Sequence, residues 1–266
     1  MANRLRAHHI RRFPGTRAIL ALVLREMSTT HGRTAGGYIW AVLEPAAAVV
    51  LLSIVFSFAF RNPPIGNNFA LFYATGYLPF AMYNDISRKL GTAIRFSRPL
   101  LAYPSVTFID AIIGRLILNT LTHLLVTALV LVGIVMFFEL NVIVDYAAIT
   151  QALAMVVALS LGLGTLNCFL LHMYAAWEQI FSIMSRPLFI LSGVLFVIDD
   201  IGQPYRDILL FNPIAHPIME LRAGLFVTYD AVHVSPVYVY TFSAICLFLG
   251  LVLLGRYSRY ILNEGV

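Results

Sequence analysis

The stretch EQIFSIMSRPLFILSGVLF occupies residues 178–196, and the motif NPIAH follows at residues 212–216. The first stretch begins as an apolar membrane span but carries Arg186 and Pro187 roughly halfway along it. A charge and a helix breaker inside hydrocarbon are costly, so both residues mark a functional position by default. Two plainer interpretations stay open: Pro187 as a simple kink, and Arg186 in a structural ion pair between helices.

The composition of the chain is that of a polytopic membrane protein. Of its 266 residues, 60% are hydrophobic and only 12% are charged, whereas a soluble domain carries about 25% charged residues. The formal net charge of +5 could suggest nucleic-acid binding. The basic residues flank apolar segments instead of forming one patch, so we expect no nucleic-acid partner.

Hydropathy predicts an all-α membrane protein with six transmembrane helices. The predicted spans cover residues 41–60, 69–86, 111–138, 146–171, 177–198 and 236–255. Ser160 and Gly164 form a small-xxx-small pair in the fourth span, a pattern typical of closely packed helices. No internal repeat is visible, which weakens the case for an inverted-repeat secondary transporter.

Two further segments are predicted to be helical without crossing the membrane. Residues 16–27 are too short to span, but Ile19, Leu22, Val23 and Met27 share one face, which predicts an amphipathic helix on the membrane surface. The alternative is a fraying helix that packs on nothing. Residues 208–226 are apolar but interrupted by prolines and charges, so we expect extracytoplasmic re-entrant or surface helices at about 200–225.

Arginine and lysine counts predict that both termini lie in the cytoplasm. Seven arginines precede residue 41, and four basic residues lie in the loop after the second span. The chain then divides into a cytoplasmic N-terminus with its interface helix (1–40), a transmembrane domain (41–256) and a cytoplasmic tail (257–266).

The sequence gives no sign of ATP hydrolysis by a phosphate-binding loop. No phosphate-binding loop is present, and Lys89 is the only lysine. The acidic residues in or near the spans lie near the predicted cytoplasmic ends, which favours interface caps over a proton path; they are Glu44, Asp85, Asp110 and Glu178. His123 is expected to be a hydrogen-bonded packing residue, with a ligand or proton-relay role as the alternative. A docking ATPase is therefore the favoured energy source, and the cytoplasmic loop after the second span suits that contact.

Four stretches together resemble the membrane subunit of an ABC-2 type exporter, and more narrowly the capsule-polysaccharide export permeases of Gram-negative bacteria. They are residues 36–45 (GGYIWAVLEP), 98–106 (RPLLAYPSV), 186–194 (RPLFILSGV) and 212–217 (NPIAHP). The resemblance implies a coupling helix at about 94–108 that seats in the ATPase. The residues expected at that contact are Arg95, Arg98, Pro99, Leu100, Tyr103 and Pro104.

The same resemblance implies a location in the inner membrane of a bacterium and a set of partners. Two copies of the permease would associate with two ATP-binding subunits, which hold the ATP and Mg²⁺, so no cofactor or metal is expected in this chain. The cargo would be a lipid-linked polysaccharide, passed to a periplasm-spanning co-polymerase and an outer-membrane channel. Residues 199–204 (DDIGQP) depart from the more neutral family pattern, which puts partner contacts at that loop in doubt.

A conduit for a hydrated and often anionic polymer needs aromatic faces and a few cations. The candidates are Tyr38, Trp40, Tyr73, Tyr77, Tyr83 and Arg186, and we expect the first and fifth spans to line the interface between two copies. Aromatic residues at span ends also form interfacial belts, which is the plainer interpretation of Tyr38 and Trp40.

Two other functions remain open on the sequence. The first is an ABC-2 permease for another cargo: O-antigen, teichoic acid, a lipo-oligosaccharide or a drug. The second is a membrane-embedded enzyme or a scaffold without transport activity. An enzyme would need an inward-facing catalytic cluster, and the spans carry no recognisable one.

Overall fold

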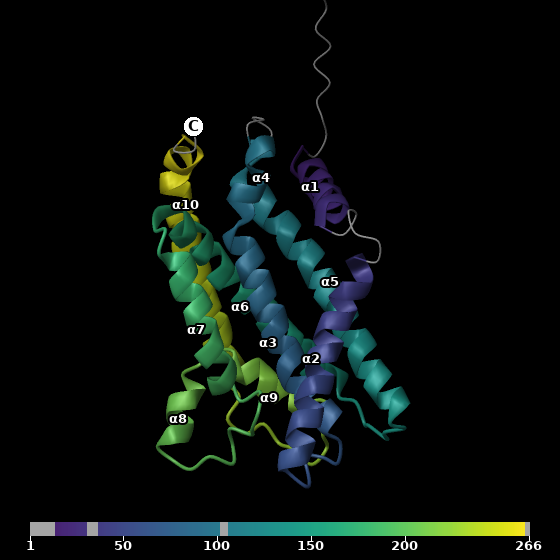
Figure 1. Cartoon of the computed structure of the whole chain (residues 1–266). Coiled ribbons are helices and arrows are strands. Elements are labelled where there is room, and N and C mark those ends of the chain that lie inside the picture. The colour runs from purple at the N-terminus through teal and green to yellow at the C-terminus, as the bar shows by residue number, and fades with distance from the viewer. Residues whose placement is uncertain (1–13, 31–36, 102–105, 264–266) are drawn as a thin grey trace, which may run out of the picture.

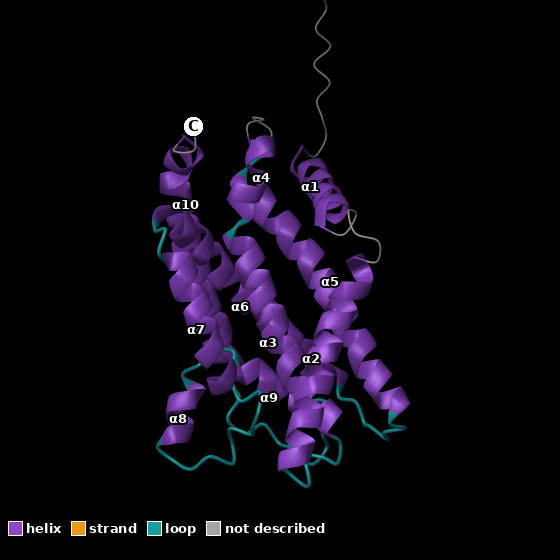
Figure 2. Ribbon diagram, viewed as in Figure 1, coloured by secondary structure: helices purple, strands orange, loops and turns teal. Residues whose placement is uncertain are grey.

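The computed structural model describes residues 14–30, 37–101 and 106–263, and within these ranges the chain is a bundle of α-helices without a strand (Figures 1 and 2). The long helices are α2 (Gly37–Ala59), α3 (Phe69–Gly91), α5 (Phe108–Phe137), α6 (Tyr146–Met173) and α10 (Pro236–Asn263). The shorter ones are α1 (Pro14–Thr30), α4 (Ala93–Leu101), α7 (Trp177–Leu191), α8 (Tyr205–Leu210) and α9 (Ala215–Ala223).

Four helices in the described ranges are both long and apolar enough to cross a membrane: α2, α5, α6 and α10. The predicted second and fifth spans differ from these four. Helix α3 has 23 residues, but its last turn carries Arg88 and Lys89. Helix α7 has only 15 residues. Length and hydropathy alone therefore identify four spans. Whether α3 and α7 also cross the membrane has to be argued from how they pack in the bundle.

Helix α6 is the centre of the bundle, packed against α3 on one side and α10 on the other. A Cβ added at Gly164 would lie 2.7 Å from the Cβ of Leu90 in α3, and one added at Gly162 would lie 2.3 Å from the carbonyl oxygen of Ser243 in α10. Ser160 is fully buried in the same helix. The predicted close approach is confirmed at Gly164, where a larger side chain would collide with Leu90.

The helix in the predicted fifth span is shorter than expected, because α7 ends at Leu191 whereas the predicted span continues to residue 198. Gly193 follows with φ at +74°, a conformation that favours glycine and turns the chain out of the helix. The buried guanidinium of Arg222 in α9 hydrogen-bonds the carbonyl oxygens of this turn. It donates to the oxygens of Gly193 (2.7 Å), Val194 (2.9 Å) and Phe196 (2.9 Å).

The segment between α7 and α10 contains the predicted pair of short helices, α8 and α9. Helix α9 is mostly buried, whereas α8 has no buried residue. The motif at 212–216 ties this segment to the end of α7 and the start of α10. Asn212 Nδ2 donates to Ser192 Oγ at 2.9 Å, and His216 Nδ1 accepts from the backbone N–H of Ser235 at 3.3 Å. Burial lowers the pKa of His216, which keeps the imidazole neutral and able to accept.

The unusual acidic pair at 199–200 is partly an internal feature. Asp199 accepts a hydrogen bond from the Tyr229 hydroxyl, and its other carboxylate oxygen lies 2.5 Å from His233 Nδ1. Burial raises the pKa of Tyr229, so the phenol stays protonated and donates. Asp199 therefore braces the loop that leads into α10.

One end of the bundle gathers α1, α4 and the C-terminal end of α10, while α8 lies at the opposite end (Figure 1). Helix α1 packs on α5, where Leu22 and Ile19 lie against Gly114. The unpacked alternative for this helix is therefore wrong. Met27 is exposed, however, and the buried face of α1 carries Glu26 instead.

The predicted coupling helix at 94–108 is shorter in the structure. Helix α4 ends at Leu101, residues 102–105 lie outside the described ranges, and α5 begins at Phe108. Thr107 and Asp110 start α5 with a reciprocal capping box. Asp110 is thus a cap, as predicted.

Candidate functional site

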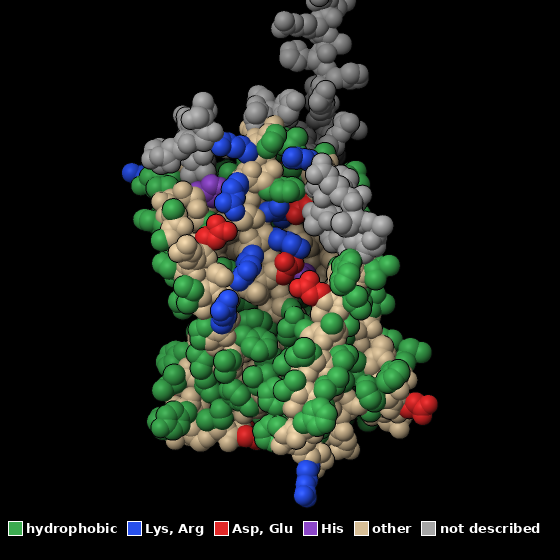
Figure 3. Space-filling model, in the orientation of Figure 1, with side chains coloured by type: hydrophobic (Ala, Val, Ile, Leu, Met, Phe, Trp, Pro, Cys, Tyr) green, Lys and Arg blue, Asp and Glu red, His purple; other side chains and the backbone are tan. Residues whose placement is uncertain are grey.

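A hollow runs down one face of the molecule between α2 and α7, with α3 at its back (Figures 1 and 3). Two adjoining cavities of about 560 Å³ each form it, and they share Asn84, Arg88 and Phe189. Charged side chains gather in the upper half of this face, and the lower half is almost entirely apolar (Figure 3). We call this hollow the groove.

The structure divides the predicted conduit residues into two sets. Trp40 and Tyr77 line the first cavity of the groove, and Arg186 lines the second. Tyr73 and Tyr83 do not reach it, because only 1% and 4% of their surfaces are exposed and both pack in the core. The side chain of Tyr38 lies outside what the structure describes.

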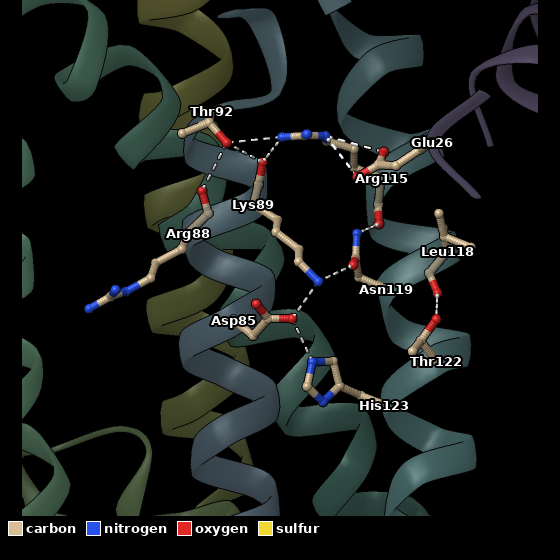
Figure 4. Close-up of polar contacts among 10 residues, drawn as sticks. All are labelled: Glu26, Asp85, Arg88, Lys89, Thr92, Arg115, Leu118, Asn119, Thr122 and His123. Carbon is tan, nitrogen blue, oxygen red and sulfur yellow. Dashed lines mark hydrogen bonds and ion pairs between the residues drawn. The ribbon is translucent and has the colours of Figure 1, made fainter. Parts of the chain in front are cut away.

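The wall of the groove carries a chain of polar contacts from α5 to α3 (Figure 4). Asp85 Oδ2 lies 2.7 Å from both Lys89 Nζ and His123 Nε2. Lys89 also donates to Asn119 Oδ1 at 2.8 Å. His123 is therefore hydrogen-bonded, as predicted, and Asp85 pairs with the one lysine of the chain instead of capping a helix end.

Arg115 continues these contacts towards α1 and the break between α3 and α4 (Figure 4). Its guanidinium lies 3.1 Å from Glu26 Oε1, and both side chains are only 7% exposed. It also donates to the Lys89 carbonyl at 2.5 Å and to Thr92 Oγ1 at 3.0 Å. The ring of Phe96 in α4 lies 4.2 Å from the same guanidinium carbon. One buried cation thus joins α1, α3, α4 and α5.

Two other arginines of the groove have no acidic partner among the described residues. Arg186 is exposed on α7 and forms no ion pair there, so the structural ion pair considered above is absent from the described chain. Arg88 points away from the polar contacts of its neighbours (Figure 4) and lies over the ring of Phe181 in α7, 5.9 Å from its centroid.

The residues expected at the ATPase contact lie on or just after α4. Arg95 pairs with Glu178 at 3.8 Å, with both side chains about two-thirds exposed. Pro99 is exposed and Leu100 is half-buried, while Ala93, Ile94 and Ser97 form the buried face of the helix. Arg98 lies on the same helix; Tyr103 and Pro104 lie outside the described residues. Helix α4 therefore presents one polar face at the end of the bundle.

The described residues contain no group of three or more metal-ligating side chains. Cys168 and Cys246 are both buried and unpaired.

A family model described as ABC-2 type transporter matches residues 17–226, which include the groove, α4 and both short helices. The chain belongs to the ABC-2 type transporter family. Proteins of this ABC-2 family are membrane subunits of transporters, and the permease is not itself catalytic.

Several curated proteins are similar to this ABC-2 chain over nearly its whole length. The polysialic acid transport protein KpsM of Escherichia coli is 30% identical over 88% of this chain and 90% of its own. The capsule polysaccharide export inner-membrane protein CtrC of Neisseria meningitidis serogroup A is 25% identical over 91% of this chain and 92% of its own. BexB of Haemophilus influenzae, named in the same way, is 24% identical over 91% and 92%.

The sequence prediction missed the Glu26–Arg115 pair. Its members are 89 residues apart, and each alone reads as an ordinary charge near a helix end. The Asp85–Lys89 pair was visible in principle, because an acidic residue four positions before a lysine in a helix is a recognised signal.

Proposed function

We propose that this chain is the permease subunit of an ATP-driven exporter that moves lipid-linked capsular polysaccharide across the bacterial inner membrane. The observation that carries this proposal is the similarity, over about nine-tenths of the chain, to permeases named for capsule polysaccharide export and polysialic acid transport. The groove supports it independently, since it combines aromatic side chains with arginines, as binding of a sugar polymer requires.

The proposed topology has six spans with both termini in the cytoplasm. A helix of 23 residues is about 35 Å long, enough for α3 to cross a hydrocarbon core of about 30 Å. Helix α7 is about 22 Å long by the same rise, so it would cross together with the turn held by Arg222. The end that gathers α1 and α4 is also rich in arginine, which supports a cytoplasmic position.

In the proposed assembly, two copies of this chain pair with two ATP-binding subunits. Helix α4 would act as the coupling helix, since its exposed side carries Arg95 and Pro99 at the proposed cytoplasmic end. ATP and Mg²⁺ would bind in the partner subunits. A periplasm-spanning co-polymerase and an outer-membrane channel would receive the polymer on the far side.

The groove would form the conduit when two copies face each other. Helices α2 and α7 flank it and expose many large apolar side chains, among them Leu51, Val55 and Ile183. In the proposed dimer these two helices would lie at the subunit interface, and Trp40, Tyr77 and Arg186 would face the cargo.

The test is a clean deletion of the gene in its own host, followed by location of surface polysaccharide and lipid-linked polymer. We expect polymer to be lost from the surface and trapped inside the cell, with both defects reversed by the intact gene. Normal surface polymer without internal accumulation would reject the capsule cargo. It would favour O-antigen, teichoic acid, a lipo-oligosaccharide or a drug as the cargo of the same architecture.

A further inference from the structure

The second cavity of the groove is cationic. It lies between α3 and α7 and is lined by Arg88 and Arg186, with Asn84 and Ser182 as smaller polar neighbours. No carboxylate is among the described residues that line it. Three acidic residues line the adjoining cavities: Asp85 pairs with Lys89, Glu178 pairs with Arg95, and Glu44 forms no ion pair with Arg88 or Arg186. The cavity therefore has positive charge that the described chain does not neutralise.

The two arginines approach the cavity from different helices. Arg88 points away from the network of Asp85 and Lys89 (Figure 4), and its contact with the Phe181 ring places its guanidinium beside α7. Arg186 lies five positions after Phe181 on α7 and is exposed. Guanidinium groups bind phosphate oxygens through paired hydrogen bonds, and an unneutralised charge inside a predicted span, as at Arg186, is costly. A bound anion would offset that cost.

The surroundings of the cavity distinguish a lipid phosphate from a sugar carboxylate. Phe189, Ile190 and Leu195 line the same cavity as the arginines. Exposed apolar residues of α7 continue from it, with Met184 60% and Leu191 48% exposed. An acyl chain can cover such a surface, whereas a hydrated polysaccharide offers it no apolar group.

We propose that Arg88 and Arg186 bind the phosphate group of a lipid anchor, at the end of the cargo that joins lipid to glycan. This inference rests on the proposed function and adds the part of the cargo that the groove recognises. In this arrangement the lipid lies along α7, and the glycan extends towards Tyr77 and Trp40.

The test measures binding of fluorescent lysophosphatidylglycerol to the permease–ATPase complex in phosphatidylcholine nanodiscs. Arg88→Gln and Arg186→Gln should each raise Kd about tenfold, as expected for loss of one charge-assisted contact. Arg61→Gln is the matched control, since Arg61 is exposed in the loop between α2 and α3, and it should leave Kd unchanged. Arg186→Lys should recover part of the affinity, which a misfolded variant would not.

Two further probes separate the source of the anion. Monoacylglycerol has the lipid without the phosphate, and its binding should not respond to either arginine variant. Glycerol phosphate has the phosphate without the lipid, and it should compete poorly. Unchanged affinity in both glutamine variants would overturn the proposal, and so would competition by glycerol phosphate as strong as that of the lysolipid.

The failure of this inference is distinct from the failure of the proposed function. If the intact gene restores surface polysaccharide while the Kd for the lysolipid is unchanged by substitution of Arg88 or Arg186, only the anchor site is rejected. If deletion of the gene leaves capsule export unchanged, the proposed function fails whatever the lipid measurements give.

Discussion

The Glu26–Arg115 pair permits a sharp test of how α1 is held on the bundle. Both side chains are only 7% exposed, and the guanidinium makes further hydrogen bonds to the Lys89 carbonyl and to Thr92. Glu26→Leu would leave Arg115 buried without its counter-ion. Removing one partner of a buried pair costs about 3–5 kcal/mol, whereas replacing both with apolar side chains is often nearly neutral.

The expected result is therefore non-additive. Glu26→Leu and Arg115→Met should each destabilise the protein by about 3–5 kcal/mol. The double variant should lose less stability than the sum of the two single losses. If unfolding is cooperative, each single variant should lower Tm by at least about 6 °C in a chain of this size. If only α1 detaches, trypsin should instead cleave faster at Arg25, inside α1.

The assay is thermal unfolding of the purified permease in detergent, combined with limited trypsin digestion. Arg256→Met is the control, because Arg256 is exposed near the end of α10. Strictly additive losses in the double variant would refute the reasoning, as would single variants within about 0.5 kcal/mol of the parent, the range of ordinary surface substitutions. Either outcome would mean that the pair does not hold α1.

Three other perturbations follow from the structure. Arg222→Met should lower the free energy of unfolding by about 3–5 kcal/mol and speed proteolysis after α7, since three buried carbonyls lose their donor. Arg222→Lys should not restore stability, because an ammonium group lacks the planar set of donors that the guanidinium offers to these carbonyls. Gly162→Ala should lower Tm by several degrees, because the new Cβ would meet the Ser243 carbonyl at 2.3 Å; Gly133→Ala, with open space around it, should not. The lowered pKa of His216 means that the unfolded chain binds the proton more readily, so this residue's contribution to stability is present above about pH 6.5 and falls below it. Stability measured from about pH 7.5 to 5.5 should therefore depend less on pH in His216→Gln than in the parent. An equal pH dependence in the two proteins would contradict the assignment.

Hydropathy alone predicts most of the helical framework. The predicted spans at 41–60, 111–138, 146–171 and 236–255 each correspond to a helix, with ends that differ by a few residues at most sites. Proline and charge in 208–226 correctly predicted short helices in place of a straight span. These features are local, because chain length, apolar content and helix breakers act within a few turns.

The position of aromatic residues on α3 could not be decided from the sequence. Tyr73, Tyr77 and Tyr83 lie on one helix with similar neighbours, yet only Tyr77 reaches the groove. Which side of α3 is open depends on where α2, α6 and α7 pack around it.

Composition, hydropathy and motifs were enough to identify a helical membrane protein, to place most of its helices, and to show that it has no ATP-hydrolysing motif. Tertiary packing was needed to end α7 at Leu191, because the arginine that binds the carbonyls just after it lies about 30 residues further along the chain. Packing also buries Glu26, whose partner is 89 residues away. A charge can be buried only where folding brings a counter-ion to it, and the spacing of the two residues along the chain does not reveal whether they meet.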